Sequence, residues 1–158
     1  MNAEEVTFTL KNLVGLGLAA IAANQGALLV ADEGGDVLHF KFVVSLNGLR
    51  RHEMAFNRLA GKTVPIGEGI TGMAALTKKA QFAGVNESKD FYRITGDGVP
   101  AAVLAVPLVC DGRLQGVMTA ISFDCYHEFT REDAEKYGQY AAIAGIVLKD
   151  AAAVSWGG

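Results

Sequence analysis

The sequence predicts an α+β fold, with an antiparallel sheet and a helix at each end of the chain. Two observations predict it. Pairs of β-rich arms surround short turns in residues 27–45 and 101–124, and each pair is typical of a hairpin of antiparallel strands. Helical patterns occupy the beginning and the end of the chain, so helices do not alternate with strands as they would around a parallel sheet. The 158 residues fit one domain covering residues 1–158.

The composition predicts a folded cytoplasmic protein with no nucleic-acid or membrane partner. Hydrophobic residues make up 51% of the chain, enough for a full core. The net charge of −3 argues against a nucleic-acid binder, which normally carries a basic stripe. The apolar run in residues 13–31 is interrupted at Asn24, Gln25 and Gly26, so it falls short of the ~18 apolar residues of a membrane span. It also lacks the basic start of a signal peptide.

The first element is a helix predicted in residues 3–24. Its apolar side chains cover more than one narrow stripe, so it has to be covered on most sides, by its own domain or by a partner chain. Gly15 and Gly17 weaken this helix by about 1 kcal/mol each relative to alanine. Gly26 is its predicted stop.

The first hairpin, in residues 27–45, has the acidic and glycine-containing turn DEGGD between its arms. In its second arm, strand alternation predicts that Leu38, Phe40 and Phe42 share one face of the sheet. Residues 51–60, which follow the hairpin, are mixed and polar and are predicted to form a short helix.

A glycine-rich stretch, VPIGEGITGMAALTKK, leads from a β-branched run into a helical pattern in residues 64–79. Its glycines match Gly-x-Gly-x-x-Gly by letter, but the Gly-x4-Gly-Lys-Ser/Thr of a phosphate-binding loop is absent. A dinucleotide fold would also need alternating strands and helices around the motif. We therefore expect Gly67 and Gly69 to permit backbone angles that a side chain would block, and Gly72 to let the helix pack closely on the sheet.

The second hairpin is the clearest signal in the chain. A short strand in residues 80–85 and a polar loop in residues 86–100 precede it. Its two β-rich arms, in residues 101–124, meet at Asp111 and Gly112, and an Asp-Gly pair accepts the positive φ angles of a two-residue turn.

The closing helix is predicted in residues 129–151. Thr130 is its predicted N-cap, and Asp133 three residues later completes a pattern close to a capping box. Apolar residues at helical spacing predict its buried face: Ala134, Tyr137, Ala141, Ile143, Ala144, Val147 and Leu148.

In this order and spacing, the chain resembles a GAF domain. The pieces that carry the resemblance are VPIGEGITGMAALTKK, VLAVPLVCDGRLQGVMTA and FTREDAEKYGQYAAIAGIVL, which together cover about residues 10–149. The resemblance implies a GAF/PAS-like fold with a six-stranded antiparallel sheet. It also implies that both terminal helices lie on one face of the sheet and a ligand pocket on the other.

The two cysteines bear on one enzymatic branch of that family, the free methionine sulfoxide reductases, which work through several cysteines around the pocket. Cys110 is predicted at a strand end, and Cys125 lies 12 residues along the returning strand, about 40 Å away if that strand is fully extended. A disulfide needs Cα atoms within about 7 Å. The cysteine positions therefore argue against an intramolecular redox pair.

The histidines do not predict a metal or cofactor site. His39, His52 and His127 are scattered, without a partner at zinc-ligand spacing. Bilin-binding members of the family anchor the pigment on a cysteine beside a histidine, and Cys125 follows the last strand instead. A haem-binding member would need a histidine in the pocket, and His39 is the one whose location permits it. We expect His39 to lie on the face opposite Phe40.

No catalytic set emerges, because the serines lack a Gly-x-Ser-x-Gly elbow. Cyclic-nucleotide members of the family carry Asn-Lys and then Phe-x3-Asp-Glu. Here Phe129 and Asp133 match, but Ala134 replaces the glutamate and the Asn-Lys is missing. The match is also what a hydrophobic staple and a helix first turn would produce.

The predicted ligand-binding residues come from the polar loop and from the sheet floor. In the loop, Asn86 and Ser88 offer hydrogen bonds, Phe91 and Tyr92 offer ring faces, and Arg93 offers a clamp for a carboxylate or phosphate. The alternative is that Arg93 pairs with Asp90 across one helical turn.

On the sheet floor, alternation predicts that either Thr119 and Ile121, or Met118 and Ser122, face the cavity. The sequence leaves these two pairs open.

The resemblance implies a sensory or regulatory domain that binds a small molecule without catalysis, its ligand and any cofactor being unidentified. We expect no attached output domain, so a signal would pass through a signalling partner or through dimer geometry. Residues 10–22 and 137–153 are rich in Ala, Gly and Leu and are predicted to pair between two chains as a homodimer, unless they cover only their own sheet. Two alternatives stay open: a sulfoxide reductase-like enzyme, and a structural dimerisation module whose pocket is filled by Phe91 and Tyr92.

Overall fold

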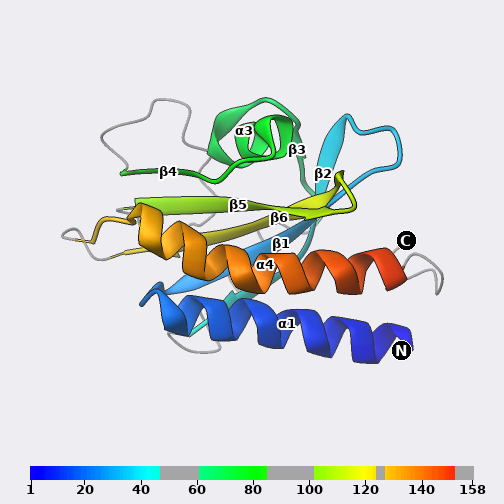
Figure 1. Cartoon of the computed structure of the whole chain (residues 1–158), viewed down its shortest axis with the longest axis horizontal. Coiled ribbons are helices and arrows are strands. Elements are labelled where there is room, and N and C mark those ends of the chain that lie inside the picture. The colour runs from blue at the N-terminus through cyan, green and yellow to red at the C-terminus, as the bar shows by residue number, and fades with distance from the viewer. Residues whose placement is uncertain (47–60, 85–101, 124–126, 152–158) are drawn as a thin grey trace.

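The computed structural model describes residues 1–46, 61–84, 102–123 and 127–151 (Figure 1). The elements, in chain order, are α1 (Ala3–Ala20), β1 (Gln25–Ala31), β2 (Val37–Ser45), β3 (Thr63–Pro65), α3 (Gly69–Thr77), β4 (Gln81–Gly84), β5 (Ala102–Cys110), β6 (Arg113–Ser122) and α4 (Arg131–Ala151). The helix predicted in residues 51–60 and the polar loop in residues 86–100 lie outside the described residues.

The six strands form one antiparallel sheet with the order β3-β2-β1-β6-β5-β4. Each of the two central strands belongs to a hairpin, since β1 pairs with β2 and β6 pairs with β5. Figure 1 shows α1 and α4 side by side on one face of the sheet and α3 on the other. The predicted α+β class, the six antiparallel strands and the position of the terminal helices are thus confirmed.

The helix α1 begins with a capping box and ends earlier than predicted. At its start, Asn2 Oδ1 accepts a hydrogen bond from the Glu5 amide at 2.9 Å, and the Glu5 carboxylate accepts one from the Asn2 amide at 3.3 Å. At its end, Ala22 has a φ of +54°, and the Ala23 amide donates back to the Leu18 carbonyl at 2.9 Å. This is a Schellman ending, which normally uses glycine at the left-handed position. The prediction of Gly26 as the stop is wrong because an alanine fills that role.

A bulge in β2 interrupts the strict alternation that was predicted for the first hairpin. Leu28 pairs with Phe42 but Leu29 pairs with Phe40, so the register with β1 skips Lys41. Side chains on either side of the extra residue therefore point to opposite faces. Phe40 packs with the residues on the α3 side, whereas Phe42 packs with the terminal helices. The prediction of one shared face fails at Phe42.

The glycines around the start of α3 behave as predicted. Gly67 and Gly69 have φ angles of +98° and +67°, which side chains rarely adopt. A Cβ added at Gly72 would lie 2.5 Å from the Pro65 carbonyl oxygen, so this glycine allows α3 to approach β3 closely. The turn between β5 and β6 is also confirmed, with φ angles of +52° at Asp111 and +76° at Gly112.

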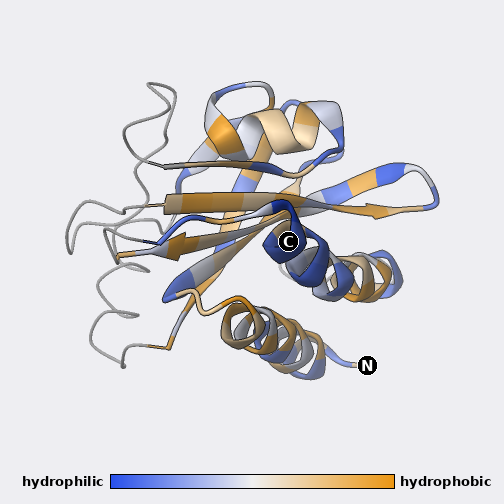
Figure 2. Cartoon of the chain, turned by 60° about the vertical axis from the view of Figure 1, so that its left-hand side comes forward, coloured by the Kyte–Doolittle hydropathy of each residue, from blue (hydrophilic) through white to orange (hydrophobic). Residues whose placement is uncertain are grey.

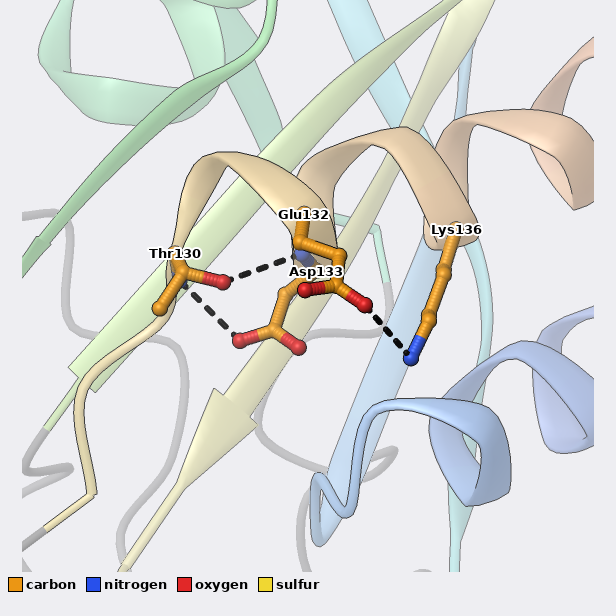
Figure 3. Close-up of polar contacts among 4 residues, drawn as sticks. All are labelled: Thr130, Glu132, Asp133 and Lys136. Atoms are coloured by element: carbon orange, nitrogen blue, oxygen red, sulfur yellow. Dashed lines mark hydrogen bonds and ion pairs between the residues drawn. The ribbon is translucent and has the colours of Figure 1, made fainter.

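The start of α4 carries the predicted capping interactions (Figure 3). The Asp133 amide donates to Thr130 Oγ1 at 3.2 Å, and the Thr130 amide donates to Asp133 Oδ2 at 3.0 Å. One turn further, Lys136 and Glu132 form an ion pair at 3.2 Å. The predicted buried face of this helix is correct except at Ile143, whose exposed fraction is 49%.

The sheet separates two apolar layers. The layer between the sheet and the terminal helices includes Leu10, Leu18, Leu104, Met118 and Tyr137. The layer on the α3 side includes Leu29, Leu38, Val64, Ile70 and Val117. Within the described part of the chain, no helix is long and apolar enough to cross a membrane.

Candidate functional site

The sheet face that carries α3 is the candidate ligand-binding face, because α1 and α4 cover the other one (Figure 1). Small side chains lie at its centre: Thr119 on β6 is flanked by Ala27 on β1 and Ala105 on β5, its partners in the two strand pairs. Apolar side chains surround this centre: Leu29, Val43, Val103, Val117 and Ile121. The centre of the face is therefore mostly apolar, and Thr119 places a hydroxyl in it.

Of the two pairs left open by the sequence, Thr119 and Ile121 lie on this face. Ile121 and Val117 belong to the apolar cluster on the α3 side. Thr119 lies two residues from each of them along β6, so its side chain shares their face. Met118 belongs to the cluster under the terminal helices. Both Thr119 and Ile121 are fully buried.

The other predicted site residues, Asn86, Ser88, Phe91, Tyr92 and Arg93, lie outside the described residues. The strand ends on either side of them are described. Gly84 pairs with Ala102, and Ala102 pairs with Ser122, directly after Ile121. The strand ends that flank the loop in sequence thus lie at the end of β6 where Ile121 lies.

Thr119 is hydrogen-bonded to a neighbouring strand and to the terminal-helix layer. On the strand side, its Oγ1 accepts from the Ala27 amide at 3.1 Å. On the helix side, its backbone carbonyl accepts from the Tyr137 hydroxyl of α4 at 2.8 Å. A single residue of the candidate site therefore contacts both the neighbouring strand and the terminal-helix layer.

Tyr137 was predicted from the sequence only as an apolar position of the last helix. It is fully buried, and burial raises the pKa of its phenol, which keeps the hydroxyl protonated as a donor. The sequence signal that could have found this contact is weak. It consists of Gly17 and Gly26, two glycines inside regular elements, and both lie against Tyr137.

The buried polar residues among those described are all neutral. They are Gln25, Thr71, Thr119 and Ser122. Gln25 and Thr119 lie on the candidate face, since Gln25 pairs with Ile121, whereas Ser122 alternates with Ile121 and points to the terminal-helix side. The buried polar groups of this sheet face are therefore an amide and a hydroxyl, without a buried charge. The described residues also contain no cluster of three or more His, Cys, Asp or Glu side chains that could hold a metal ion.

Of the candidate redox and haem residues that the structure describes, none belongs to the apolar cluster on this face. Cys110 is a free, half-buried cysteine beside the β5–β6 turn, and Cys125 lies outside the described residues. His39 is exposed, while its neighbour Phe40 packs on the α3 side. His127 packs edge-on against Phe129, with ring centres 4.7 Å apart.

Two lysines, one from α3 and one from α4, bind the β5–β6 turn by a hydrogen bond and an ion pair. Lys78, the C-cap residue of α3, donates a hydrogen bond from its ammonium group to the Gly112 carbonyl at 2.8 Å. Lys149, in the last turn of α4, pairs with the Asp111 carboxylate. This ion pair lowers the pKa of Asp111 and raises the pKa of Lys149. The turn therefore joins α3 and α4 at the end of the sheet opposite Ile121.

Comparisons with known proteins agree with this architecture, although no curated protein sequence matches the chain. The GAF-B domain of DevS from Mycobacterium smegmatis is similar over 94% of this chain and 96% of its own, with a TM-score of 0.69 and 16% identity. The GAF domain of a phosphoenolpyruvate-protein phosphotransferase from Coxiella burnetii has the same TM-score and identity, over 97% and 98% of the two chains.

A free methionine-R-sulfoxide reductase from Neisseria meningitidis, solved in complex with its substrate, is also similar. Its TM-score is 0.69 at 22% identity, over 91% of this chain and 78% of that one. At these identities the three likenesses describe the fold alone. The family model for the GAF domain matches residues 3–149, nearly the whole chain, and the chain therefore belongs to the GAF domain family.

Proposed function

We propose that this GAF domain is a non-catalytic regulatory module that binds a small molecule on the α3 face of its sheet. The observation that carries the proposal is Thr119, a fully buried hydroxyl at the centre of an apolar face. Ligand sites of this kind combine apolar walls with a few polar groups that orient the ligand. The loop residues Asn86 to Arg93 would complete the site from the neighbouring strand ends.

We further propose that two copies of the chain pair through α1 and α4, so that dimer geometry carries the signal. Large apolar side chains are exposed on the outside of these helices: Phe8 (70%) and Leu16 (58%) on α1, and Ile143 (49%) and Ile146 (53%) on α4. The α1 helix, next to the N label in Figure 2, is hydrophobic along most of its length. A second copy would cover these side chains with an identical set.

Native mass spectrometry of the freshly purified protein tests both parts. We expect a dimer carrying an extra, non-covalent mass that is lost under denaturing conditions. Ile146→Glu should yield monomers, because a charge would be buried in the helix interface. Leu76→Glu is the matched control, since Leu76 is 59% exposed on α3, on the other side of the sheet.

Three outcomes would contradict the proposal. A bare wild-type monomer would rule out the dimer through the terminal helices. A dimer without any retained mass, and without one after incubation with a metabolite extract, would favour a structural dimerisation module. Turnover of free methionine sulfoxide would make the chain an enzyme, as its similarity to the Neisseria reductase would then suggest.

A further inference from the structure

Gln25, the first residue of β1, places a carboxamide on the α3 face of the sheet near Thr119. Strand alternation puts it on the same face as Ala27 and Leu29, which belong to the apolar cluster on the α3 side. Gln25 pairs with Ile121, two residues from Thr119 along β6. The side chains of Gln25 and Thr119 are therefore diagonal neighbours, and such neighbours are about 7–8 Å apart, within reach of a long side chain.

The amide oxygen of Gln25 is buried and accepts no hydrogen bond from the part of the chain that the structure describes. The residue as a whole is 2% exposed, and other atoms of it do interact with the chain. A carboxamide oxygen has two lone pairs, and burial without a donor leaves its lost hydration uncompensated. A leucine of similar volume would avoid that cost. A donor that a ligand brings to this oxygen would compensate it.

Thr119 supplies the complementary group. Its Oγ1 accepts from the Ala27 amide at 3.1 Å and still carries the hydroxyl hydrogen, which it can donate to a carbonyl oxygen. The bond from Ala27 and a bond to a ligand therefore use different parts of the hydroxyl. Together, the acceptor of Gln25 and the donor of Thr119 match the N–H and the C=O of an amide group.

No charged side chain is buried on the described part of this face. The side chains that surround Gln25 and Thr119 on β1, β5 and β6 are apolar: Ala27, Val103, Ala105 and Ile121. A carboxylate would place a second acceptor against the Gln25 oxygen, and an ammonium would be buried without a counter-ion. An uncharged amide can satisfy both groups without either penalty.

We infer that Gln25 selects the inner end of the ligand, and that this end is an uncharged carboxamide or an equivalent pair of N–H and C=O groups. Its N–H donates to Gln25 Oε1, and its carbonyl accepts from the Thr119 hydroxyl. The inference rests on the proposed function. It adds a specificity-determining residue and the chemical class of the group that this residue recognises.

Titration of the full chain with three probes of similar shape tests the inference. The probes are benzamide, benzoate and benzylammonium, and the backbone amide resonances of Ala27 and Ile121 report binding. At neutral pH we expect benzamide to bind about tenfold more tightly than either charged probe. Gln25→Leu should weaken benzamide binding about fivefold to tenfold. Gln25→Glu should reverse the preference and favour benzylammonium, because the new carboxylate pairs with the ammonium.

Gln81→Leu is the matched control and should leave all three titrations unchanged. Gln81 lies on the edge strand β4, where its Nε2 donates to Thr77 Oγ1 at 3.2 Å. Tighter binding of a charged probe to the wild type overturns the inference, as does unchanged benzamide binding in Gln25→Leu. If Gln25→Leu does not fold, Gln25→Glu decides, because an unchanged order of the three probes rejects a selecting role for Gln25.

Failure of the inference can be distinguished from failure of the proposed function. A retained mass in the native spectra, together with tighter binding of a charged probe, rejects the inference alone. Binding of none of the three probes overturns the inference as well. If the native spectra then also show no retained mass, the proposed function fails with it.

Discussion

Gly17 of α1 provides the space that the ring of Tyr137 of α4 occupies. The nearest ring carbons would be 2.7 Å from a Cβ at position 17, closer than atoms can approach without a shift. Because Tyr137 is fully buried and bonded to Thr119, its ring has no room to retreat. The glycine that weakens α1 as a helix is therefore the residue that allows the two terminal helices to pack.

Gly17→Ala should destabilise the protein despite the better helix propensity of alanine. Overpacking costs about 1–3 kcal/mol, more than the propensity gain of about 1 kcal/mol. Urea unfolding measures the difference. Gly138→Ala on α4 is the control, because nothing lies within 4 Å of its added Cβ, and it should be neutral or stabilising. Equal effects of the two variants would contradict the steric explanation.

Gly72→Ala should loosen α3 from the edge of the sheet. Its Cβ would lie 2.5 Å from the Pro65 carbonyl and 3.1 Å from the Gly67 amide nitrogen, both backbone atoms with little freedom. We expect a loss of about 2 kcal/mol, seen as a fall of about 4–8 °C in Tm. Gly15→Ala on α1, whose Cβ would lie 3.9 Å from Val44, should not lower Tm.

Thr130→Ala should lower the free energy of unfolding by about 1 kcal/mol, because the Asp133 amide loses its cap. Chemical denaturation followed by far-UV circular dichroism measures this loss. Lys136→Ala in the same two turns removes only the exposed ion pair with Glu132 and should cost less than 0.5 kcal/mol. A larger loss at Lys136 than at Thr130 would refute the capping assignment in Figure 3.

The ion pair between Asp111 and Lys149 predicts a pH dependence that can be isolated with Asp111→Asn. Asp111 has a lowered pKa, so its stabilising contribution is present above the ordinary value of 3.8 and is lost as the pH falls through the folded-state pKa. Lys149 has a raised pKa, so its contribution is present below the ordinary value of 10.5 and is lost as the pH rises through the folded-state pKa.

The difference in Tm between wild type and Asp111→Asn should therefore be flat from pH 5 to 9 and shrink on both sides. Lys78, which holds the same turn through a backbone carbonyl, should show no such acid-side loss when Lys78→Met is compared with wild type. A difference that grows toward low pH would show that the pair does not stabilise the fold.

The elements that the sequence predicted correctly depend on local signals. The two-residue turn at Asp111 and Gly112, the positive φ angles at Gly67 and Gly69, and the Thr130 cap each follow from residue types within a few positions. The end of α1 was predicted wrongly because alanine, not glycine, takes the left-handed position at Ala22. No local signal marked it.

The errors and open points at the candidate site concern contacts between distant segments. Alternation along β6 separates Thr119 and Ile121 from Met118, but only the packing of α3 and α4 decides which set faces which layer. The bulge at Lys41 arises from the pairing of β2 with β1, and it reverses the face of Phe42. The bond between Tyr137 and Thr119 joins the last helix to the last strand and leaves no pattern in either segment alone.

The order of the strands also has a consequence for how the chain is made. The centre of the sheet joins β1 to β6, with Gln25 paired to Ile121, and the buried stripe of α1 packs on α4. A chain emerging from the ribosome can form the β1–β2 hairpin early, but one edge of β1 stays open until β6 appears. Such long-range closure slows folding relative to a helical protein of equal length. The half-synthesised domain therefore exposes a strand edge that the complete domain covers.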